Sequence, residues 1–436
     1  MEAKRKVAFY TLGCKLNFAE TSTLSGIFTN NGFERVDHSQ SADIYVINTC
    51  SVTEQSDRKC RQVIRKFIRQ SPNAIIAVTG CYAQLKPEEI ASIEGVDLVL
   101  GADGKEKLFE YINSIGNKGE TRIFSCEIND VDSFFQAFSS GDRTRSFLKV
   151  QDGCNYNCAY CTIPTARGKS RNPSIDSIIN KAINISALGI KEIILTGVNI
   201  GDFGRTGNEQ FIDLLKALNE VDGIERFRIS SIEPNLLTNE IIDFVSQSKK
   251  FLPHYHIPLQ SGSNRILKLM RRRYLRELFG EKIEVLRSKN PYTFFGIDVI
   301  AGFPGETDSD FEDTYNFLEE LNPAYLHIFP YSERPGTASV NMNNKVNSAT
   351  INARAKQLGK LNSKLHSKFY AENIGRHEEV LFESLSKRGM MYGFTKNYIK
   401  VEIPYNKDLT GEIIPVELIG IADSGNMNVK ITVMDS

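Results

Sequence analysis

Short apolar runs alternate with amphipathic stretches along the first 112 residues of the chain. The runs are rich in β-branched and aromatic residues, and each is followed by a stretch whose apolar positions have helical spacing. This alternation predicts a small α/β domain with a parallel sheet over residues 1–112. The predicted strands are VAFYTL (7–12), DIYVIN (43–48), AIIAVT (74–79) and DLVLG (97–101).

The pattern changes twice further along the chain. Residues 113–145 have many Gly, Ser and Asn and little periodicity, which predicts a linker. Strand–helix alternation resumes over 146–375 and favours a complete or partial (β/α) barrel, with an open doubly wound sheet as the alternative. Residues 376–436 contain short alternating strands broken by Gly and Asn, which predicts a small β-barrel. The strands predicted for the central region are FLKVQD (147–152), EIILTG (192–197), RFRISS (226–231), HYHIPL (254–259), TFFGIDVIAG (293–302) and AYLHIFPY (324–331).

The composition is that of a globular protein, with 41% hydrophobic and 24% charged residues in 436 positions. A net charge of zero argues against indiscriminate binding to nucleic acid but allows a local basic surface. No run approaches the roughly 20 apolar residues of a membrane span, and the N-terminus has no signal-peptide pattern. We therefore expect a reducing, cytoplasmic location without a membrane partner. Clustered cysteines there are more often metal ligands or redox centres than disulfides.

Three of the eight cysteines lie close together in GCNYNCAYC (153–161), directly after a predicted strand. Loops at that end of a strand bind ligands in barrels and open α/β sheets. Cys154, Cys158 and Cys161 could ligate three irons of a cubane cluster, whereas electron-transfer clusters usually have four thiolates. One iron would then be open to a substrate or cofactor. The alternatives are unrelated thiols or a zinc site, which would need a fourth Cys or His nearby.

Cys14, Cys50 and Cys81 each lie just past the C-terminal end of a different predicted strand of the first domain. Such positions converge on one crevice in a parallel sheet, so we expect these three thiols to meet in space and to form a second three-cysteine site. Cys60 lies in a basic helical run and Cys126 in the predicted linker. We interpret both as buried or incidental thiols rather than ligands.

The chain resembles the radical S-adenosylmethionine (SAM) methylthiotransferases along nearly its whole length. CNYNCAYC resembles the CxxxCxxC loop of radical SAM enzymes, and LTGVN (195–199) their Gly-rich segment. The final domain resembles the TRAM barrel, an RNA-binding module. Three of the matching segments, TLGCKLN, NTCSVT and GCNYNCAYCTIPTARGKSR, are most similar to the branch that modifies N6-threonylcarbamoyladenosine beside the tRNA anticodon. The matching segments are TLGCKLN, NTCSVT, TGCYAQ, GCNYNCAYCTIPTARGKSR, SSIEP, HIPLQSGS, IDVIAGFPGET and FPYSERPGT.

The resemblance implies addition of a methylthio group to C2 of the adenine, a carbon whose C–H bond is neither acidic nor electrophilic and so needs a radical. Two 4Fe-4S clusters and two SAM molecules are implied, one SAM methylating a sulfur and the other yielding the radical. The anticodon stem-loop of tRNA and an external electron donor such as flavodoxin or ferredoxin are the implied partners. The candidates for SAM binding, several of which could instead cap loops, are Tyr160, Gly197, Asn199, Ser231, Glu233, Gln260 and Asp298.

An RNA substrate needs cations for its phosphates and aromatic or polar groups for its unstacked bases. On a helix, at most two of three consecutive arginines should face one ligand. Acidic residues outnumber basic ones over 376–436, so RNA contact there would need a local patch, for which Lys387, Arg388, Lys400, Tyr392 and Phe394 are further candidates. The predicted tRNA contacts are Arg167, Lys169, Arg171, Arg271, Arg272, Arg273, Lys396 and Tyr398.

Three alternatives remain open from the sequence. The same chemistry could act on isopentenyl-adenosine tRNA or on an aspartate of a ribosomal protein. A non-catalytic iron–sulfur or RNA-binding protein would predict no SAM cleavage. A B12-dependent radical enzyme is disfavoured because the N-terminal domain lacks the DxHxxG motif that would ligate cobalt.

Overall fold

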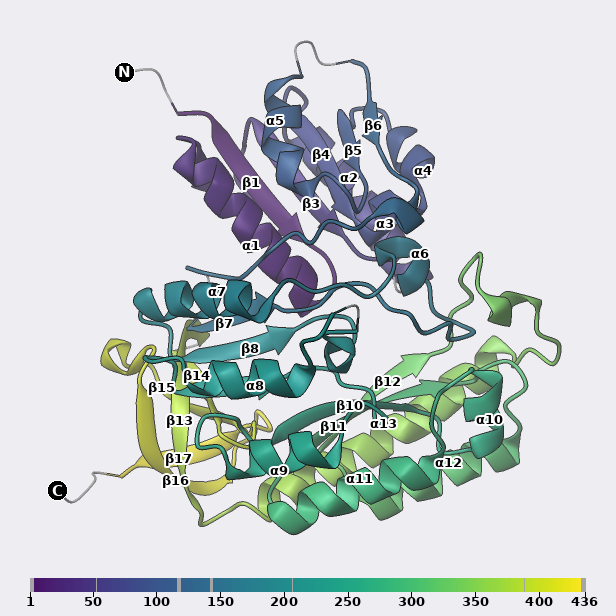
Figure 1. The fold of residues 1–436 in the computed structure, drawn as a ribbon, viewed down its shortest axis with the longest axis vertical. Coiled ribbons are helices and arrows are strands. Elements are labelled where there is room, and N and C mark those ends of the chain that lie inside the picture. The colour runs from purple at the N-terminus through teal and green to yellow at the C-terminus, as the bar shows by residue number, and fades with distance from the viewer. Residues whose placement is uncertain are drawn as a thin grey trace.

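A computed structural model describes residues 4–51, 53–115, 119–141, 144–205, 207–387 and 389–432. Figure 1 shows an N-terminal α/β unit above a central strand-and-helix unit, with a small β-barrel against the lower part of the latter. Within the described residues, no helix is both long and apolar enough to span a membrane. The α/β class and the C-terminal β-barrel expected from the sequence are confirmed.

The N-terminal sheet is parallel and has the strand order β2-β1-β3-β4-β5-β6. Alternate residues of β3 face opposite sides: Tyr45 and Ile47 pack toward α2, whereas Ile44 and Val46 join a second core with α1 and α5. The short outer strands β2 and β6 were not predicted, and β6 lies within the stretch expected to be a linker. The elements are β1 (Lys6–Thr11), α1 (Lys15–Asn30), β2 (Glu34–Val36), β3 (Ile44–Thr49), α2 (Glu54–Gln70), β4 (Ile75–Gly80), α3 (Cys81–Leu85), α4 (Pro87–Ala91), β5 (Leu98–Leu100), η1 (Lys105–Lys107), α5 (Leu108–Asn113), β6 (Arg122–Phe124) and η2 (Ile128–Asp130).

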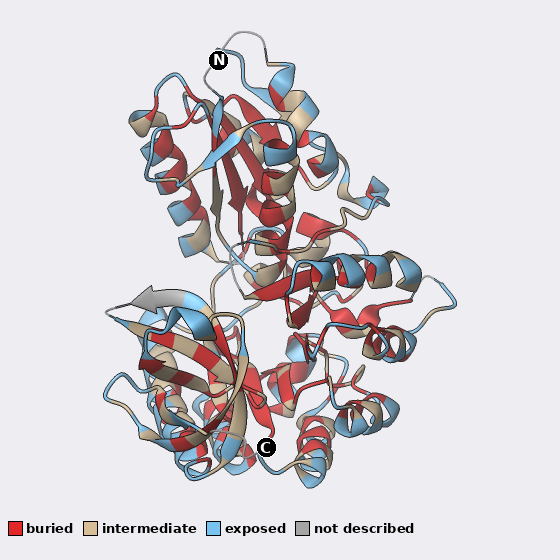
Figure 2. Cartoon of the chain, turned by 90° about the vertical axis from the view of Figure 1, so that its left-hand side faces the viewer, coloured by how far each residue is buried: buried red, intermediate tan, exposed pale blue. Residues whose placement is uncertain are grey.

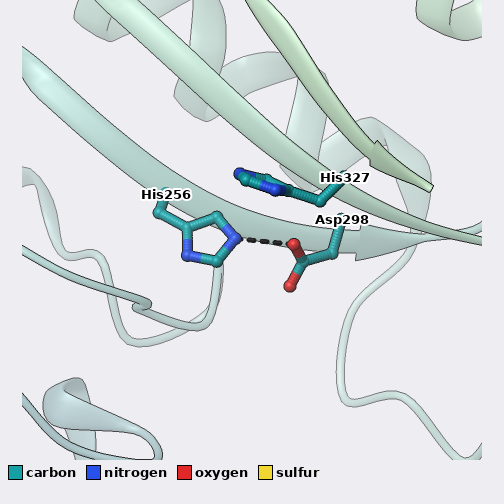
Figure 3. A group of neighbouring side chains, drawn as sticks. All are labelled: His256, Asp298 and His327. Carbon is teal, nitrogen blue, oxygen red and sulfur yellow. Dashed lines mark hydrogen bonds and ion pairs between the residues drawn. The ribbon is translucent and has the colours of Figure 1, made fainter. Parts of the chain in front are cut away.

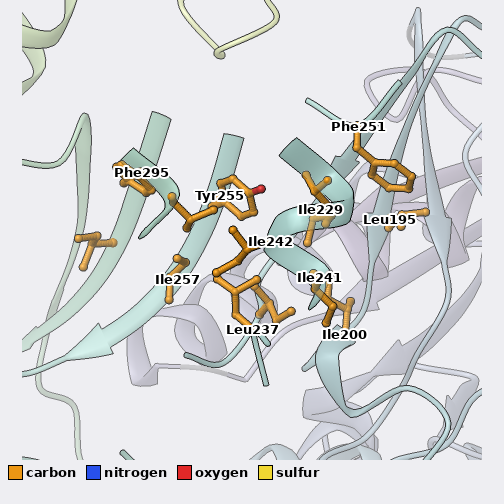
Figure 4. Packing of buried hydrophobic residues seen from close by; sticks show 14 of the residues in the cluster. Leu195, Ile200, Ile229, Leu237, Ile241, Ile242, Phe251, Tyr255, Ile257 and Phe295 are labelled. Carbon is orange, nitrogen blue, oxygen red and sulfur yellow. The ribbon is translucent and has the colours of Figure 1, made fainter. Parts of the chain in front are cut away.

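The central unit is a partial barrel of parallel strands in two hydrogen-bonded groups, β7-β8-β9 and β10-β11-β12. Parallel bridges from Phe227 to Phe251 and from Ser231 to His256 connect the two groups. Helices cover the outside, where apolar residues such as Ile241 and Ile242 pack against the strands (Figure 4). The elements are β7 (Arg145–Lys149), α6 (Ile163–Arg167), α7 (Ile175–Ala187), β8 (Glu192–Thr196), η3 (Ile200–Asp202), α8 (Phe211–Asn219), β9 (Arg226–Ile229), α9 (Asn239–Gln247), β10 (His254–Gln260), α10 (Asn264–Leu269), α11 (Arg276–Lys289), β11 (Phe294–Ala301), α12 (Asp308–Leu321), β12 (Tyr325–Pro330), η4 (Ala338–Asn341) and α13 (Ser348–Ala371).

The C-terminal unit is a closed barrel with the order β13-β14-β15-β17-β16. Its inward-facing residues include Val380, Phe382, Val401 and Leu418, which are buried. Figure 2 shows how burial is distributed over the described residues: the strands inside are mostly buried, and the surrounding helices have exposed outer faces. The elements are β13 (His377–Lys387), β14 (Met390–Thr395), β15 (Lys400–Pro404), η5 (Lys407–Leu409), β16 (Ile413–Ile421) and β17 (Met427–Ile431).

A buried ladder of charges attaches the C-terminal barrel to the central unit. Arg145, Glu192 and Arg226 are paired in register on β7, β8 and β9. Arg228, two residues further on β9, donates to Glu192 at 2.8 Å and also to the backbone carbonyls of residues 395 and 396, at 2.8 and 2.9 Å. Arg145 donates to Glu383 of β13 at 2.6 Å. One carboxylate therefore orients the arginines that hold the C-terminal barrel.

We predict that Arg228→Met destabilises the chain by about 3–5 kcal/mol, because it removes a buried partner of Glu192 and two contacts to the C-terminal barrel. The matched control is Lys191→Met, which breaks the more exposed Lys191–Glu412 pair between the same two units and should cost less than about 1 kcal/mol. Urea unfolding followed by circular dichroism measures both. Equal losses in the two variants would contradict the role given to the ladder.

His254 makes the stability of this interface depend on pH. Burial lowers its pKa well below the usual value, and Arg228 and Lys15 add to the shift. The folded chain therefore keeps His254 neutral where the unfolded chain binds a proton, so the free energy of unfolding falls as pH drops below about 6.5. We predict that His254→Phe, which keeps an aromatic ring against Tyr398, reduces this slope between pH 6.5 and 5 by up to about 1.4 kcal/mol per pH unit. An unchanged slope in urea titrations would contradict the prediction.

Candidate functional site

The loop that follows β7 brings Cys154, Cys158 and Cys161 together. It closes on itself through an antiparallel bridge between Asp152 and Arg171. Gly153 makes this closure possible, because its φ is +73° and a Cβ there would overlap the carbonyl oxygen of Lys169. The residue type at the start of the loop is therefore set by backbone packing.

Each thiol of this loop receives a hydrogen bond. The backbone N–H of Tyr156 donates to Cys154 Sγ at 3.4 Å, that of Ile163 to Cys161 Sγ at 3.4 Å, and Arg272 Nη1 to Cys158 Sγ at 3.1 Å. Burial raises the pKa of Cys154 to about 11 and that of Cys161 to about 12. These thiols would hold their protons without a metal, and iron would displace them. The donors are placed to stabilise sulfurs that carry negative charge.

The second set of cysteines lies at the C-terminal edge of the N-terminal sheet. Cys14 caps α1 after β1, Cys50 follows β3, and Cys81 begins α3 after β4. The segments pack closely, since a Cβ on Gly13 would lie 2.8 Å from the Cβ of Cys50, and Cys14 contributes to the raised pKa of Cys81 after the larger effect of burial. The three converge on one edge, as expected for neighbouring parallel strands. Cys60 lies behind them on α2, fully buried, with its Sγ 3.5 Å from the carbonyl oxygen of Cys50, and Cys126 is half-buried.

A buried network of charges connects the two cysteine sets. Glu20 of α1 is fully buried and accepts hydrogen bonds from Lys105, Lys149 and Arg167, at 2.6, 3.0 and 3.1 Å. Arg167 also donates to Asp152 at 2.9 Å. Burial alone would raise the pKa of Glu20, but Arg167, Lys105 and Lys149 hold it well below its usual range. The network connects the N-terminal sheet to the loop of Cys154.

Polar side chains then extend across the interior of the barrel. Arg272 pairs with Glu233, whose pKa is raised by burial and further by Asp298. Asp298 lies 2.6 Å from His256 Nε2, and His327 completes a group whose ligand atoms lie within 4.8 Å of one another (Figure 3). Burial, and then His256, lowers the pKa of His327 to about 4. This group comes from three adjacent strands, and of its members only Asp298 was singled out in the sequence.

The other candidates for SAM binding lie at the same strand ends. Gly197 is crowded by Gln151, whose side chain accepts from the backbone N–H groups of Val198 and Asn199, at 3.0 and 2.9 Å. Asn199 is 3% exposed, and neither atom of its side-chain amide has a hydrogen-bond partner among the described residues. Tyr160 lies 3.4 Å from Arg272, Gln260 has a φ of +69°, and Ser231 bridges to β10. An orphaned buried amide beside the cysteine loop fits a polar ligand such as SAM.

The structure separates the predicted RNA contacts into buried and exposed groups. Arg167 and Arg272 are engaged inside the protein, so the structure does not support their assignment to phosphate. Arg171 donates to the carbonyl oxygens of Ser133 and Arg167 and lies 3.4 Å from Asp152. Lys169, Arg271 and Arg273 are exposed, and the guanidinium of Arg273 lies over the Tyr156 ring. The three consecutive arginines therefore diverge, with Arg272 facing inward.

In the C-terminal barrel, Lys396 pairs with Glu379 at 2.8 Å. Tyr398 packs on His254 and Phe394, with ring centroids 4.1 and 4.7 Å apart, and lines a cavity that residues of the other two units also line. Lys400 lies over the ring of Tyr392. Arg388 and the side chain of Lys387 lie outside the part of the chain that the structure describes.

Several residues of the site could not be identified from the sequence. Glu20, Lys105 and Lys149 occupy ordinary helical or strand positions, and their convergence depends on contacts between distant segments. Lys15 could have been considered from the sequence, because it directly follows the predicted ligand Cys14. His256 also had a clue, since it shares a face of its strand with buried neighbours, whereas His327 shares a face with half-buried Tyr325 and exposed Phe329.

Comparison with known proteins agrees with this geometry. Residues 148–318 match the radical SAM superfamily, and residues 6–101 match a family described as uncharacterized protein family UPF0004. The fold is similar to that of a radical SAM methyltransferase, TsrM, from Kitasatospora setae, with a TM-score of 0.57 over 76% of this chain and 74% of that one at 14% identity. The cysteine loop and barrel are thus those of a radical SAM enzyme, a class that carries a 4Fe-4S cluster and SAM.

Similarity to curated relatives is higher and covers nearly the whole chain. The chain is 41% identical over 429 residues, 95% of its length and 93% of the relative, to a protein of Bacillus subtilis named threonylcarbamoyladenosine tRNA methylthiotransferase MtaB. It is 32% identical, over 95% of its length and 96% of the relative, to a protein of Thermodesulfovibrio yellowstonii named tRNA-2-methylthio-N(6)-dimethylallyladenosine synthase. The chain belongs to the radical SAM methylthiotransferase family and is a transferase.

We predict that Arg167→Met lowers the free energy of unfolding of the apoprotein by about 3–5 kcal/mol, because Glu20 and Asp152 lose a buried cation. The matched control is Lys169→Met, in the same loop but exposed, which should change stability by less than about 0.5 kcal/mol. Urea unfolding measures both values. If Arg167→Met instead weakened RNA binding without loss of stability, Arg167 would be a phosphate contact after all.

Proposed function

We propose that this chain adds a methylthio group to C2 of N6-threonylcarbamoyladenosine next to the anticodon of tRNA, using two 4Fe-4S clusters and two molecules of SAM. The observation that carries the proposal is the presence of two three-cysteine sets, one at the C-terminal edge of the N-terminal sheet and one in the loop after β7, connected by the buried network of Glu20, Arg167 and Asp152. The name of the relative at 41% identity, a threonylcarbamoyladenosine tRNA methylthiotransferase, supports the choice of substrate. The relative at 32% identity makes isopentenyl-adenosine tRNA the competing substrate.

Cys154, Cys158 and Cys161 would hold the SAM-binding cluster, and Cys14, Cys50 and Cys81 the other one. A cubane distributes its ligand sulfurs over different irons, so the thiols need more separation than around a single ion. The hydrogen-bond donors at the first set, and Arg167 and Lys105 beside the second, favour the anionic thiolates that iron requires. When bound, the clusters and SAM supply the electron, the carbon radical and the activated sulfur.

The remaining residues would position ligands. Asn199, with its buried and unpartnered amide, would bind a polar group of SAM, and Glu233 is held beside Cys158 by Arg272. Asp298 and His256 would contact the substrate base. Exposed Lys169, Arg271 and Arg273 surround the cysteine loop and would contact phosphates of the anticodon stem-loop. Flavodoxin or ferredoxin is the proposed electron donor.

We predict that the anaerobically reconstituted chain binds about eight irons, and that the variant Cys14→Ala/Cys50→Ala/Cys81→Ala keeps about four, since each thiol set would hold one cubane. Cys60→Ala is the matched control, because this buried thiol lies outside both sets and should leave the iron content unchanged. Colorimetric iron analysis measures all three proteins. A triple variant that retained eight irons would rule out a cluster at the N-terminal set.

The substrate is tested in a host strain whose own gene for this activity is deleted. Expression of the chain should restore 2-methylthio-N6-threonylcarbamoyladenosine in tRNA, as detected by mass spectrometry of nucleosides, and Cys158→Ala should abolish the restoration. Restoration of the methylthio derivative of isopentenyl-adenosine alone would refute the proposed substrate. If the chain cleaved SAM but modified no tRNA, the proposed tRNA substrate would be wrong and a protein side chain would become the candidate.

A further inference from the structure

A cavity of about 560 Å³ lies where the start of α1 meets the strands of the central unit and the C-terminal barrel. In Figure 1, the lower end of α1 approaches β7 and β8 at this place. Its walls come from all three units of the chain and include one of the cysteines of the N-terminal set. The lining residues are Phe9, Tyr10, Thr11, Gly13, Cys14, Lys15, Phe18, Thr21, Ser22, Arg35, His38, Arg145, Phe147, Ile194 and Tyr398.

The walls of this cavity are cationic. Arg35, Lys15 and Arg145 line it, whereas its described lining contains no aspartate or glutamate. The side-chain ammonium of Lys15 makes no hydrogen bond or ion pair to any other residue in the described part of the chain. An interior surface with several cations and no carboxylate favours an anionic ligand.

Arg145 gives independent evidence for a ligand. It is 5% exposed, and although its Nη2 donates to Glu383, its Nε and Nη1 have no hydrogen-bond partner in the described structure. Glu192 is 3.7 Å from Nη1, which is too long for a hydrogen bond. Burial would raise the pKa of Tyr398, but Arg145 and Lys15 lower it, so the Tyr398 hydroxyl is the nearest group that interacts with these donors. Buried guanidinium donors are normally satisfied, so donors left over beside a cavity favour an anionic acceptor there.

Aromatic rings also line this cavity. Tyr398 has a φ of +63°, and its ring is held in place between His254 and Phe394. Phe18 and Phe147, which also line the cavity, pack edge to face with ring centroids 5.7 Å apart. The cavity therefore combines flat apolar surfaces with cations, which suits a planar base that carries an anionic substituent.

We propose that Lys15 and Arg145 bind the carboxylate of the threonyl group on the target base and thereby select this base over an isopentenylated one. The inference rests on the proposed function and goes beyond it by naming the residues that distinguish the two substrates. A threonylcarbamoyl group ends in a carboxylate, whereas an isopentenyl group is apolar and could not satisfy either cation. Cys14 lines the same cavity as Lys15, so a base bound there would lie beside the N-terminal thiol set.

A phosphate of the anticodon loop is the other possible source of the anion, and the test separates the two. Anticodon stem-loop RNAs are prepared with N6-threonylcarbamoyladenosine either as the free acid or as its neutral methyl ester. Dissociation constants for the reconstituted enzyme are measured by fluorescence anisotropy, and kcat/KM by mass spectrometry of the product. Both RNAs have the same phosphates, so a difference between them reports the carboxylate.

The wild-type enzyme should bind the acid about tenfold or more tightly than the ester. Lys15→Gln should weaken binding of the acid, and lower its kcat/KM, about ten- to a hundredfold, the range for one charge-assisted hydrogen bond. It should leave binding of the ester nearly unchanged, and Lys15→Arg should retain most of the discrimination. Lys360→Gln, on the exposed face of α13, is the matched control. Iron content should be the same in all four proteins.

Equal binding of acid and ester by the wild-type enzyme would overturn the carboxylate site, whatever the turnover. Equal losses for the two RNAs in Lys15→Gln would assign the lysine to a phosphate. These outcomes differ from a failure of the proposed function, in which the wild-type enzyme would modify an isopentenyl stem-loop but neither of the threonylcarbamoyl RNAs.

Discussion

The buried contact between Glu20 and Arg167 is the interaction on which the arrangement of the two cysteine sets depends. Glu20 belongs to the helix that starts at Cys14, and Arg167 ends the short helix that follows Cys161. Lys105, Lys149 and Asp152 complete the network, so cations outnumber carboxylates between the two sets. Buried ion pairs of this kind are costly to break yet add little net stability. Their contribution is a defined geometry, with an excess of positive charge beside thiols that must ionise.

A second buried network fixes the opposite end of the barrel. Glu192 orients Arg145, Arg226 and Arg228 beneath the C-terminal barrel, and Arg228 donates to two of its backbone carbonyls. Surface charges would be screened and mobile, whereas these pairs are almost fully excluded from water. The central unit is thus joined to the N-terminal unit and to the C-terminal barrel by two separate buried networks.

The alternation of apolar runs was sufficient to predict the parallel strands. The close spacing of Cys154, Cys158 and Cys161 predicted one set, and the positions of Cys14, Cys50 and Cys81 just after three strands predicted the second. That success has a physical basis, since strand ends of a parallel sheet share an edge. The roles of Arg167 and Arg272 could not be predicted in this way. In the sequence both are simply basic residues near the cysteine loop or in a run of arginines. Their buried ion pairs with Glu20 and Glu233, which lie far away in the sequence, are what distinguish them from exposed cations that could bind phosphate. The outer strands β2 and β6 are too short to produce a pattern.

Rigid positioning of this kind is what sulfur insertion into a C–H bond requires. A carbon radical reacts with whatever lies closest, so the sulfur and the target carbon must be held together before the radical forms. Two thiol sets on separate flexible segments could not meet this demand. Here each set lies at the C-terminal ends of strands of its own sheet. The two sheets are joined by buried ion pairs, and breaking such a pair strongly destabilises the fold.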